Sequence, residues 1–454
     1  MLRMAKKDLM EKIFDKGREY GLKDMEIYLG KGSSFRVRIH KGEIDNYSVS
    51  STEGLSLRGE YNGQMGYAHT SKLDESSVEM LARNAKENAE VLTNEDKEVI
   101  FEGSPEYKLK DTYSEKLDRV TEKEKIEFAK EMEAKAYAFD KRIESVPYCY
   151  YGDSSGETLI KNTKGLELFS KNNMAYCIVN VVASDGNDKK SGTAYRCSGD
   201  FYTFNAEEIA REACENAIPL LGGKSVKSGS YPVLMDREAV IDLFSACSDI
   251  FNAELVQKGL SLLKGKLGEA IASEKISFID DPFIDMAAGY RAFDDEGVAC
   301  RYKKIVDKGV LTTYFHNLKT ALTDGTETTG NAYRASYSSS ISIAPTNFYI
   351  ENGDTDVAEM LNRMGTGIMI TEIEGLHAGL NTVSGDFSLS ARGFYIKNGK
   401  KERPVEQITV SGNYLTLLKD VAAVGNDFKF GMPDGGGYKG APSLLIEKLS
   451  VAGE

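Results

Sequence analysis

Three consecutive carboxylates are the most chemically suggestive feature of the chain. Asp294, Asp295 and Glu296 lie in the run F-D-D-E-G at 293–297, and His316 follows downstream. If this run is a strand, Asp294 and Glu296 share one face, where paired carboxylates can exchange protons or bind a hard cation. The alternative interpretation is structural, because a solvent-exposed strand end, or the start of a hairpin with a capping aspartate, has the same composition. Both interpretations are open at this point.

A second polar segment follows these carboxylates. Residues 328–334 read T-T-G-N-A-Y-R, in which Asn331, Tyr333 and Arg334 supply amide, phenol and guanidinium groups. Charge and glycine at this density between apolar segments favour a groove or an interface over a plain core. We predict that Asn331, Tyr333 and Arg334 line a substrate groove.

Other chemical motifs are missing from the sequence. The histidines at 40, 69, 316 and 377 form no i, i+3 or i, i+4 pair, and the cysteines at 149, 177, 197, 214, 247 and 300 form no C-x-x-C pair. A metal site assembled from distant residues stays open. There is no G-x-S-x-G element, and the glycine-rich run at 431–440 lacks the phosphate-loop pattern. That run predicts a loop over a groove or a partner surface.

Composition restricts the class of protein. A chain of 454 residues with 41% hydrophobic and 28% charged residues predicts a globular protein of two domains. The net charge of −13 argues against nucleic acid and anionic membranes as partners, and favours a peptide or protein. We find no signal peptide and no apolar run long enough to span a membrane. Scattered cysteines in a chain of this length indicate reduced thiols and a cytoplasmic location.

The first half predicts helices and antiparallel strands in a repeated order. Helical spacing occurs at 5–20, 75–92, 121–139 and 206–221, and alternating segments with turn residues such as Asn62-Gly63 fill the intervals. Similar residues recur in the same order, for example T-E-G-L-S-L at 52–57 and T-K-G-L-E-L at 163–168. We therefore predict an α+β domain over 1–225 with an internal duplication of 5–92 and 121–220.

The second half predicts a β-rich domain over 226–454. A linker rich in Gly, Ser and Lys precedes it, and a helix with a regular apolar stripe is expected from Arg237 to Val256. Hairpin turns are expected at 307–309, 351–353 and 397–399, with one short helix at 355–364. The fold class is α+β, with a mainly antiparallel sheet or barrel in this half.

Several segments together resemble the TldD/PmbA family, whose members are described as modulators of DNA gyrase and as peptidase subunits. They include D-D-P at 280–282, F-D-D-E-G at 293–297, T-G-N-A at 329–332, S-G-D-F-S at 384–388 and L-S-V-A-G at 449–453. Their order and spacing extend through nearly all of 275–453. In the first half, G-L-S-L-R at 54–58 and G-Y-A at 66–68 also look like the family.

The resemblance implies which of two subunit types the chain is. The TldD type carries H-E-x-x-x-H on the helix that opens the second domain, and a cysteine in the glycine-rich C-terminal loop. At the corresponding positions this chain has Phe244, Ser245 and Asp249, and no cysteine follows Cys300. It therefore looks like the PmbA or TldE type, which binds no zinc itself. This implies a heterodimer with a TldD-like zinc subunit that cleaves small unfolded peptides, and no catalytic residue or metal ligand on this chain.

Two other functions remain open. One is an autonomous hydrolase whose candidate residues are Asp294, Glu296 and His316. The other is a non-enzymatic interaction protein that regulates a machine such as a topoisomerase. The chain could also pair with itself when alone, because related subunits share interface geometry.

Overall fold

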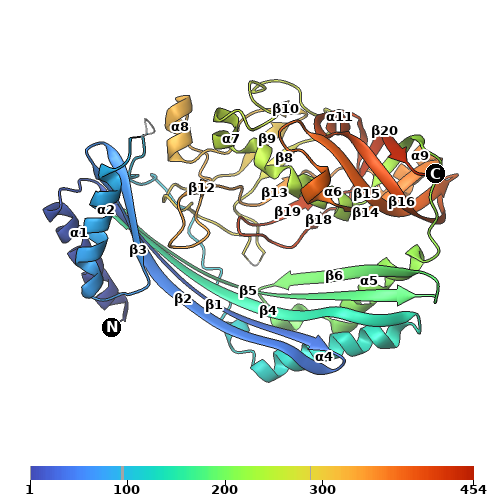
Figure 1. The fold of residues 1–454 in the computed structure, drawn as a ribbon, viewed down its shortest axis with the longest axis horizontal. Helices are drawn as coiled ribbons and strands as arrows, with labels where there is room; N and C mark the ends of the chain where they lie inside the picture. The colour runs from blue at the N-terminus through green and yellow to red at the C-terminus, as the bar shows by residue number, and fades with distance from the viewer. Residues whose placement is uncertain (1, 94–96, 287) are drawn as a thin grey trace.

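The structure, a computed structural model, describes residues 2–93, 97–286 and 288–454 and has two parts. Figure 1 shows long strands of the N-terminal part curving beneath a C-terminal part built of shorter elements. This is the α+β fold with two domains that the sequence predicts.

One antiparallel sheet of six strands organises the N-terminal part, in the order β3-β2-β1-β4-β5-β6. Its strands are β1 (Met25–His40), β2 (Glu43–Tyr61), β3 (Gln64–Thr70), β4 (Ile143–Asn162), β5 (Glu167–Ser184) and β6 (Lys189–Ser198). The helices are α1 (Leu2–Glu19), α2 (Ser76–Glu90), α3 (Glu115–Asp118), α4 (Glu122–Phe139) and α5 (Ala206–Ala217), with 3₁₀ turns η1 (Phe201–Thr203) and η2 (Ile218–Leu220). Apart from the short α3 and the 3₁₀ turns, each half of the sheet has the same order of elements: a helix, three strands and a helix.

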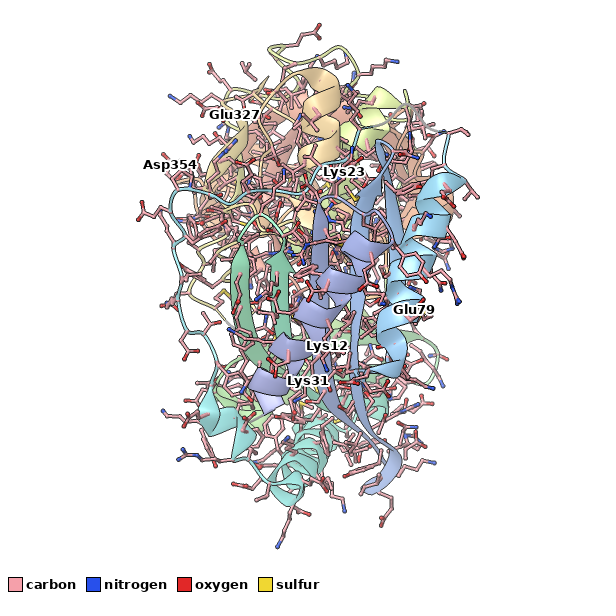
Figure 2. The ribbon with its side chains drawn as sticks, turned by 90° about the vertical axis from the view of Figure 1, so that its left-hand side faces the viewer. Lys12, Lys23, Lys31, Glu79, Glu327 and Asp354 are labelled. Carbon is pink, nitrogen blue, oxygen red and sulfur yellow. The ribbon has the colours of Figure 1, made fainter. Side chains whose placement is uncertain are left out.

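Each half of this sheet has its own core. Helices α1 and α2 cover the end formed by β1, β2 and β3, and Figure 2 shows them side by side, with Lys12 and Glu79 on their outer surfaces. Helices α4 and α5 cover the other end, and the Thr121–Glu124 capping box starts α4. Between the two cores the strands carry small residues in register, such as Gly32 opposite Thr52 and Gly156.

A barrel forms the centre of the C-terminal part. Its strands follow the order β16-β15-β14-β7-β20, and it closes because β16 also pairs with β20. These strands are β7 (Gly229–Met235), β14 (Gly367–Glu374), β15 (Asp386–Lys397), β16 (Lys400–Asn413) and β20 (Leu444–Ala452), with β17 (Val421–Val424) added to β20. The β14–β7 pair is parallel, and the other pairs of this sheet are antiparallel.

A second sheet carries the segments that the sequence singles out. Its order is β10-β9-β8-β13-β19-β18, and a two-strand ladder of β11 and β12 lies apart from it. The strands are β8 (Phe278–Asp280), β9 (Lys303–Asp307), β10 (Val310–Leu311), β11 (Ala332–Tyr333), β12 (Ser342–Ile343), β13 (Phe348–Ile350), β18 (Lys429–Phe430) and β19 (Lys439–Ala441). Besides the helical region at 237–257, described below, this part contains α8 (Leu318–Asp324), α9 (Val357–Met364), α10 (Leu376–Gly379) and α11 (Tyr414–Lys419).

The predicted hairpin turns are confirmed at 62–63, 308–309 and 398–399. Both residues of each pair have positive φ, as a type I′ turn requires. The turn predicted at 351–353 is wrong. Strand β13 pairs with β8 and β19, and the chain runs on from it into α9. Gly353 is needed there for close packing, since a Cβ on it would lie 2.1 Å from the Val424 carbonyl oxygen.

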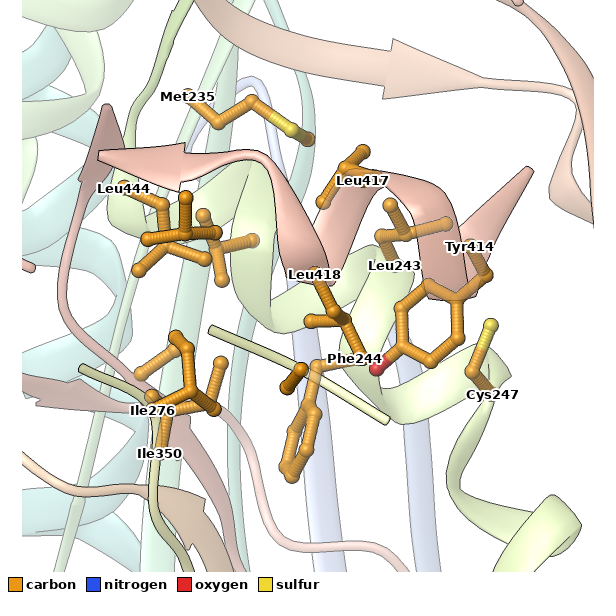
Figure 3. Packing of buried hydrophobic residues seen from close by; sticks show 14 of the residues in the cluster. Met235, Leu243, Phe244, Cys247, Ile276, Ile350, Tyr414, Leu417, Leu418 and Leu444 are labelled. Carbon is orange, nitrogen blue, oxygen red and sulfur yellow. The ribbon is translucent and has the colours of Figure 1, made fainter. Parts of the chain in front are cut away.

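The single helix predicted from Arg237 to Val256 is also wrong. It is divided into α6 (Arg237–Ala246), the 3₁₀ turn η3 (Ser248–Phe251) and α7 (Ala253–Gln257). The break has a local cause, because the Ser248 hydroxyl donates to the Ser245 carbonyl and Asn252 caps a new helix. The apolar stripe still forms the core, where Phe244 and Cys247 pack near Tyr414 and Leu418 (Figure 3).

No helix among the described residues is long and apolar enough to cross a membrane.

Candidate functional site

The F-D-D-E-G run is a buried turn rather than the strand considered from the sequence. The Asp294 side chain accepts three backbone N–H groups, from Glu296 (3.0 Å), Val298 (3.0 Å) and Ala332 (3.0 Å). Asp294 is 0% exposed and Glu296 is 3% exposed. The first carboxylate of the run therefore holds the fold of its own turn and fastens β11 to it.

The other two carboxylates belong to an ionic network that joins the two parts of the chain. Arg58 on β2 pairs with Glu26 on β1 at 2.8 Å and with Glu296 at 3.5 Å. Arg334, which follows β11, pairs with the same Glu26 at 3.1 Å, and its backbone N–H donates to Asp295 at 2.7 Å. All of these residues are buried, so at the interface their charged groups bind one another instead of water.

When Asp294 is counted with this network, there is one more carboxyl group than there are guanidinium groups, so one of the carboxyls can hold a proton. The carboxylates of Glu26, Asp294, Asp295 and Glu296 outnumber by one the guanidinium groups of Arg58, Arg334 and Arg291, the last of which pairs with Asp295 at 2.8 Å. Burial raises the pKa of Glu296 to about 8 and that of Asp294 to about 6. Asp294 accepts three backbone N–H groups, whereas Glu296 accepts one, that of Leu318, and a long contact of 3.5 Å from Arg58, so the proton belongs on Glu296.

Asn331 and His316 are also fully enclosed. The Asn331 amide donates to Asp280 (3.1 Å) and to the Ala344 carbonyl (3.0 Å), while Lys303 pairs with Asp280 at 2.7 Å. The His316 ring lies 3.3 Å from the Thr320 hydroxyl, and burial lowers its pKa, which favours the neutral imidazole. The structure thus places these two residues in the scaffold.

Close-packed glycines hold the two parts together. Tyr337 of the C-terminal part lies against β2, where a Cβ on Gly54 would come within 2.3 Å of its ring. Gly297, at φ 82°, closes the F-D-D-E-G turn, and a Cβ there would come within 2.4 Å of Leu166. Side chains larger than glycine would separate these surfaces.

A cavity of about 840 Å³ opens at this interface. Five segments line it: 109–113, 169–172, 290–293, 333–335 and 433–437, with further contributions that include Met174 and Asp295. Tyr333 and Arg334, which the sequence predicts to line a groove, are among the residues that line this cavity. The glycine-rich loop also borders it. Asp294, Glu296, His316 and Asn331 are not among the described residues that line it.

One wall of the cavity is a sheet edge. Strand β6 pairs with β5 only from Ala175 onward, so among the described residues no strand pairs with the outer edge of β5 between Ser170 and Met174. The segment 109–113 also lines the cavity, where Lys171 lies 3.3 Å from the centroid of the Tyr113 ring. Sequence reasoning missed this segment, because it forms no regular element and carries no motif.

The residues at the expected zinc positions do not fit a metal ion. Phe244 is 1% exposed and packs against Phe278 and Phe348, with ring centroids 5.1 and 4.7 Å away. Asp249 lies on η3, beyond the end of α6, and is exposed. In the described part of the chain no three His, Cys, Asp or Glu residues are grouped so as to hold a metal.

Comparison with known proteins gives matches along nearly the whole chain. Models of the PmbA/TldA metallopeptidase match as domain 1 (25–89), central domain (115–221) and C-terminal domain (228–453). A protein named a metalloprotease from Methanothermobacter thermautotrophicus is 28% identical over 90% of this chain and 89% of its own.

Solved structures give the same result. One from Thermotoga maritima, described as a candidate modulator of a DNA gyrase, has a TM-score of 0.90 and 35% identity over 98% of this chain and 100% of its own. TldE from Thermococcus kodakarensis has a TM-score of 0.89 at 24% identity, with coverage of 98% and 100%, and shares the fold.

Proposed function

The chain belongs to the PmbA/TldD metallopeptidase family, and from this premise we propose that it is the zinc-free, PmbA/TldE-like subunit of a two-chain peptidase. Its partner would be a TldD-like subunit that carries H-E-x-x-x-H and the zinc. The complex would cleave small unfolded peptides in the cytoplasm. This chain would form part of the wall that holds the peptide.

The observation that carries the proposal is the contrast between α6 and the cavity. The helix that would present zinc ligands instead buries Phe244 in an aromatic cluster, so its role here is structural. The cavity nevertheless persists, with Tyr333, Arg334 and the loop 433–437 on its walls. A subunit with a binding wall, but with no group of metal ligands among its described residues, would rely on a second chain for the zinc.

The cavity suits an extended peptide. The outer edge of β5 from Ser170 to Met174 can offer backbone groups to a strand, which is how many proteins bind peptides independently of sequence. The charged residues that line it are balanced: Lys110, Lys171, Arg291 and Arg334 against Asp111, Glu115, Asp295 and Asp434. Such a lining does not select strongly for peptide charge.

This chain's part in the reaction would be to bind and orient the peptide and to limit its access to water. Zinc on the partner would supply the Lewis acid that activates water and polarises the scissile carbonyl. The network of Arg58, Glu26 and Arg334 would keep the cavity wall rigid, so that the peptide is held in one position.

Affinity capture of the tagged chain from its native cell, followed by metal and peptidase assays, tests the proposal. We expect a co-purifying chain of similar length with H-E-x-x-x-H, about one zinc per heterodimer, and cleavage of unfolded peptides by the pair only. Stoichiometric zinc and full activity in the isolated chain would contradict it. Recovery of topoisomerase subunits instead would favour the regulatory function described for the Thermotoga relative.

A further inference from the structure

The first part of strand β2 is an open edge of the N-terminal sheet. Strand β1 pairs with one side of β2 from Glu43 to Gly59, whereas β3 pairs with the other side only from Leu55 to Tyr61. Among the described residues no strand pairs with that outer side before Leu55. All ten residues of the segment Glu43–Thr52, here called the β2 edge, are exposed. Figure 1 shows the strand along the outer rim of the sheet.

The internal repeat contains a second edge of the same kind, on β5. Strand β6 pairs with β5 only from Ala175 onward, as β3 pairs with only part of β2. The unpaired stretch of β5 faces the cavity, where other segments of the same chain surround it. The β2 edge has no such surroundings, since each of its residues is exposed. It is therefore open to a strand from another chain.

The turn at the far end of β2 shows which backbone groups point outward. Tyr61 and Gln64 flank a two-residue turn and so form a hydrogen-bonded pair between β2 and β3. Every second residue back along β2 directs its N–H and C=O to the same side, and the register has no irregularity between residues 47 and 61. Tyr47, Val49 and Ser51 therefore direct their backbone groups to the outer edge.

The side chains of the β2 edge are those of a strand that lacks a neighbour. Ile44, Tyr47 and Val49 are large apolar residues with exposed fractions of 44%, 43% and 62%. The Tyr47 ring lies 5.4 Å from that of Phe35, which belongs to the core under α4, so this core continues uncovered to the rim. The edge contains no proline and no lysine, the residues that commonly block pairing at sheet edges.

The β2 edge is complementary to itself. A second, antiparallel strand on it must end before β3, which reaches the outer side at Leu55. A register centred on Ser48 meets this limit and still uses the edge from end to end. In that register Tyr47 of each copy lies opposite Val49 of the other. Aromatic and β-branched residues form favourable cross-strand pairs, and here the pair occurs twice.

The charges of the edge are compatible with this register. Asp45 lies opposite Ser51 of the other copy, and it already pairs with Arg38 of its own chain at 3.2 Å. Glu43 and Glu53 approach each other only at the two ends of the edge. Glu53 lies opposite Lys31 on β1, which offsets the negative charge there.

We propose that two copies of this chain associate through their β2 edges, antiparallel and around a two-fold axis at Ser48. The two six-stranded sheets become one continuous sheet. The two Tyr47–Val49 pairs alone exchange about four backbone hydrogen bonds, and each Val49 is covered by a tyrosine. This inference concerns the chain without a TldD-like subunit and does not rest on the proposed function.

Sedimentation equilibrium of the purified full-length chain tests the association. We expect a reversible dimer with a Kd of about 1–100 µM, because the contact is a strand edge rather than a large apolar face. Val49→Lys and Ser51→Pro should each raise the Kd about tenfold or more. Val91→Lys is the control, since Val91 is 75% exposed at the end of α2. All three variants should keep the wild-type melting temperature.

Disulfide crosslinking tests the register. Ser48→Cys should form a crosslinked dimer with itself under mild oxidation, because residues opposite each other in a non-hydrogen-bonded pair have the Cβ separation that a disulfide requires. Asn46→Cys and Ser50→Cys should crosslink when mixed and not when alone. Wild type is the control for the partly exposed Cys197.

The outcomes separate the possible occupants of the edge. A chain that stays monomeric at about 0.1 mM, or a dimer that both edge variants leave intact, would overturn the proposal. Crosslinking of Asn46→Cys or Ser50→Cys with itself would overturn the register. If the chain is monomeric and Val49→Lys prevents capture of a TldD-like subunit, the edge binds that subunit and pairing between copies is wrong.

Discussion

Replacing Glu296 with glutamine should leave the protein stable and change how its stability depends on pH. Glutamine has the shape and the neutral charge of the protonated acid, which balances the network of Glu26, Arg58, Asp295 and Arg334. The pKa of Glu296 is raised by burial from 4.5 to about 8, so the folded chain keeps this proton over a range in which the unfolded chain has lost it.

The sign and size follow from linkage. The pKa of Glu296 is higher in the folded chain than in the unfolded chain, so its protonation stabilises the folded chain fully below about pH 4.5. This stabilisation is lost as the pH rises toward 8. A shift of that size corresponds to at most about 5 kcal/mol at 1.36 kcal/mol per pH unit, and because the charge of Asp294 contributes to the shift and Asp294 titrates together with Glu296, we expect roughly 2–4 kcal/mol. Wild type should lose this stability relative to Glu296→Gln between pH 5 and 9.

The assay is urea unfolding followed by far-UV circular dichroism at pH 5, 7 and 9, because the chain contains no tryptophan. Asp294→Asn is the contrasting variant. Its amide replaces a carboxylate that accepts three backbone N–H groups, and we expect it to cost about 2–5 kcal/mol at pH 7 and 9. Two results would refute the assignment of the proton to Glu296. One is the same pH dependence of the free energy of unfolding in wild type and Glu296→Gln, and the other is an equal loss of stability in both variants.

Three further predictions concern packing and thiols. Gly54→Ala should loosen the Tyr337 contact and lower the free energy of unfolding by about 1–3 kcal/mol, which is measured as faster proteolysis between the two parts. The control is Gly32→Ala, whose Cβ would meet atoms only at 3.5 Å and which should leave the proteolysis rate unchanged. Phe244→Ala should lower the free energy of unfolding by about 3–5 kcal/mol, and a near-neutral result would count against a structural role for α6. A thiol reagent at pH 8 should label at most Cys197 in the folded protein and all six cysteines in urea. The other five cysteines are buried in the folded protein, and burial raises the pKa of Cys247 and Cys300 to about 12. Rapid labelling of several thiols in the folded protein would contradict this prediction.

Local patterns predicted the local structure well. Asn62-Gly63 and Asn398-Gly399 specify their turns because few other residue pairs accept positive φ, and α4 starts where Thr121 and Glu124 can cap it. The α+β class and the glycine-rich loop beside a groove also follow from spacing and composition. Each of these depends on residues within a few positions of one another.

The carboxylate run shows where such patterns fail. Whether Asp294 is a reactive acid or a capping group depends on the backbone N–H of Ala332, and whether Glu296 is charged depends on Arg58 in the other half of the chain. Neither partner can be identified from the sequence around 294–296. The cavity segment 109–113 was missed for a similar reason, since only the tertiary fold brings it to β5.

The position of the network connects the F-D-D-E-G run to the cavity wall. Burying charged groups at an interface costs more desolvation free energy than burying apolar groups there. A buried ionic network, however, accepts only one arrangement of partners. Arg334 lines the cavity and also pairs with Glu26, while Arg291 lines it and pairs with Asp295. The same contacts that dock the two parts therefore fix two cationic side chains of the cavity wall. A change in the protonation of Glu296 would reach the cavity through these arginines, because the network cannot change its charge without disturbing the partners that hold them.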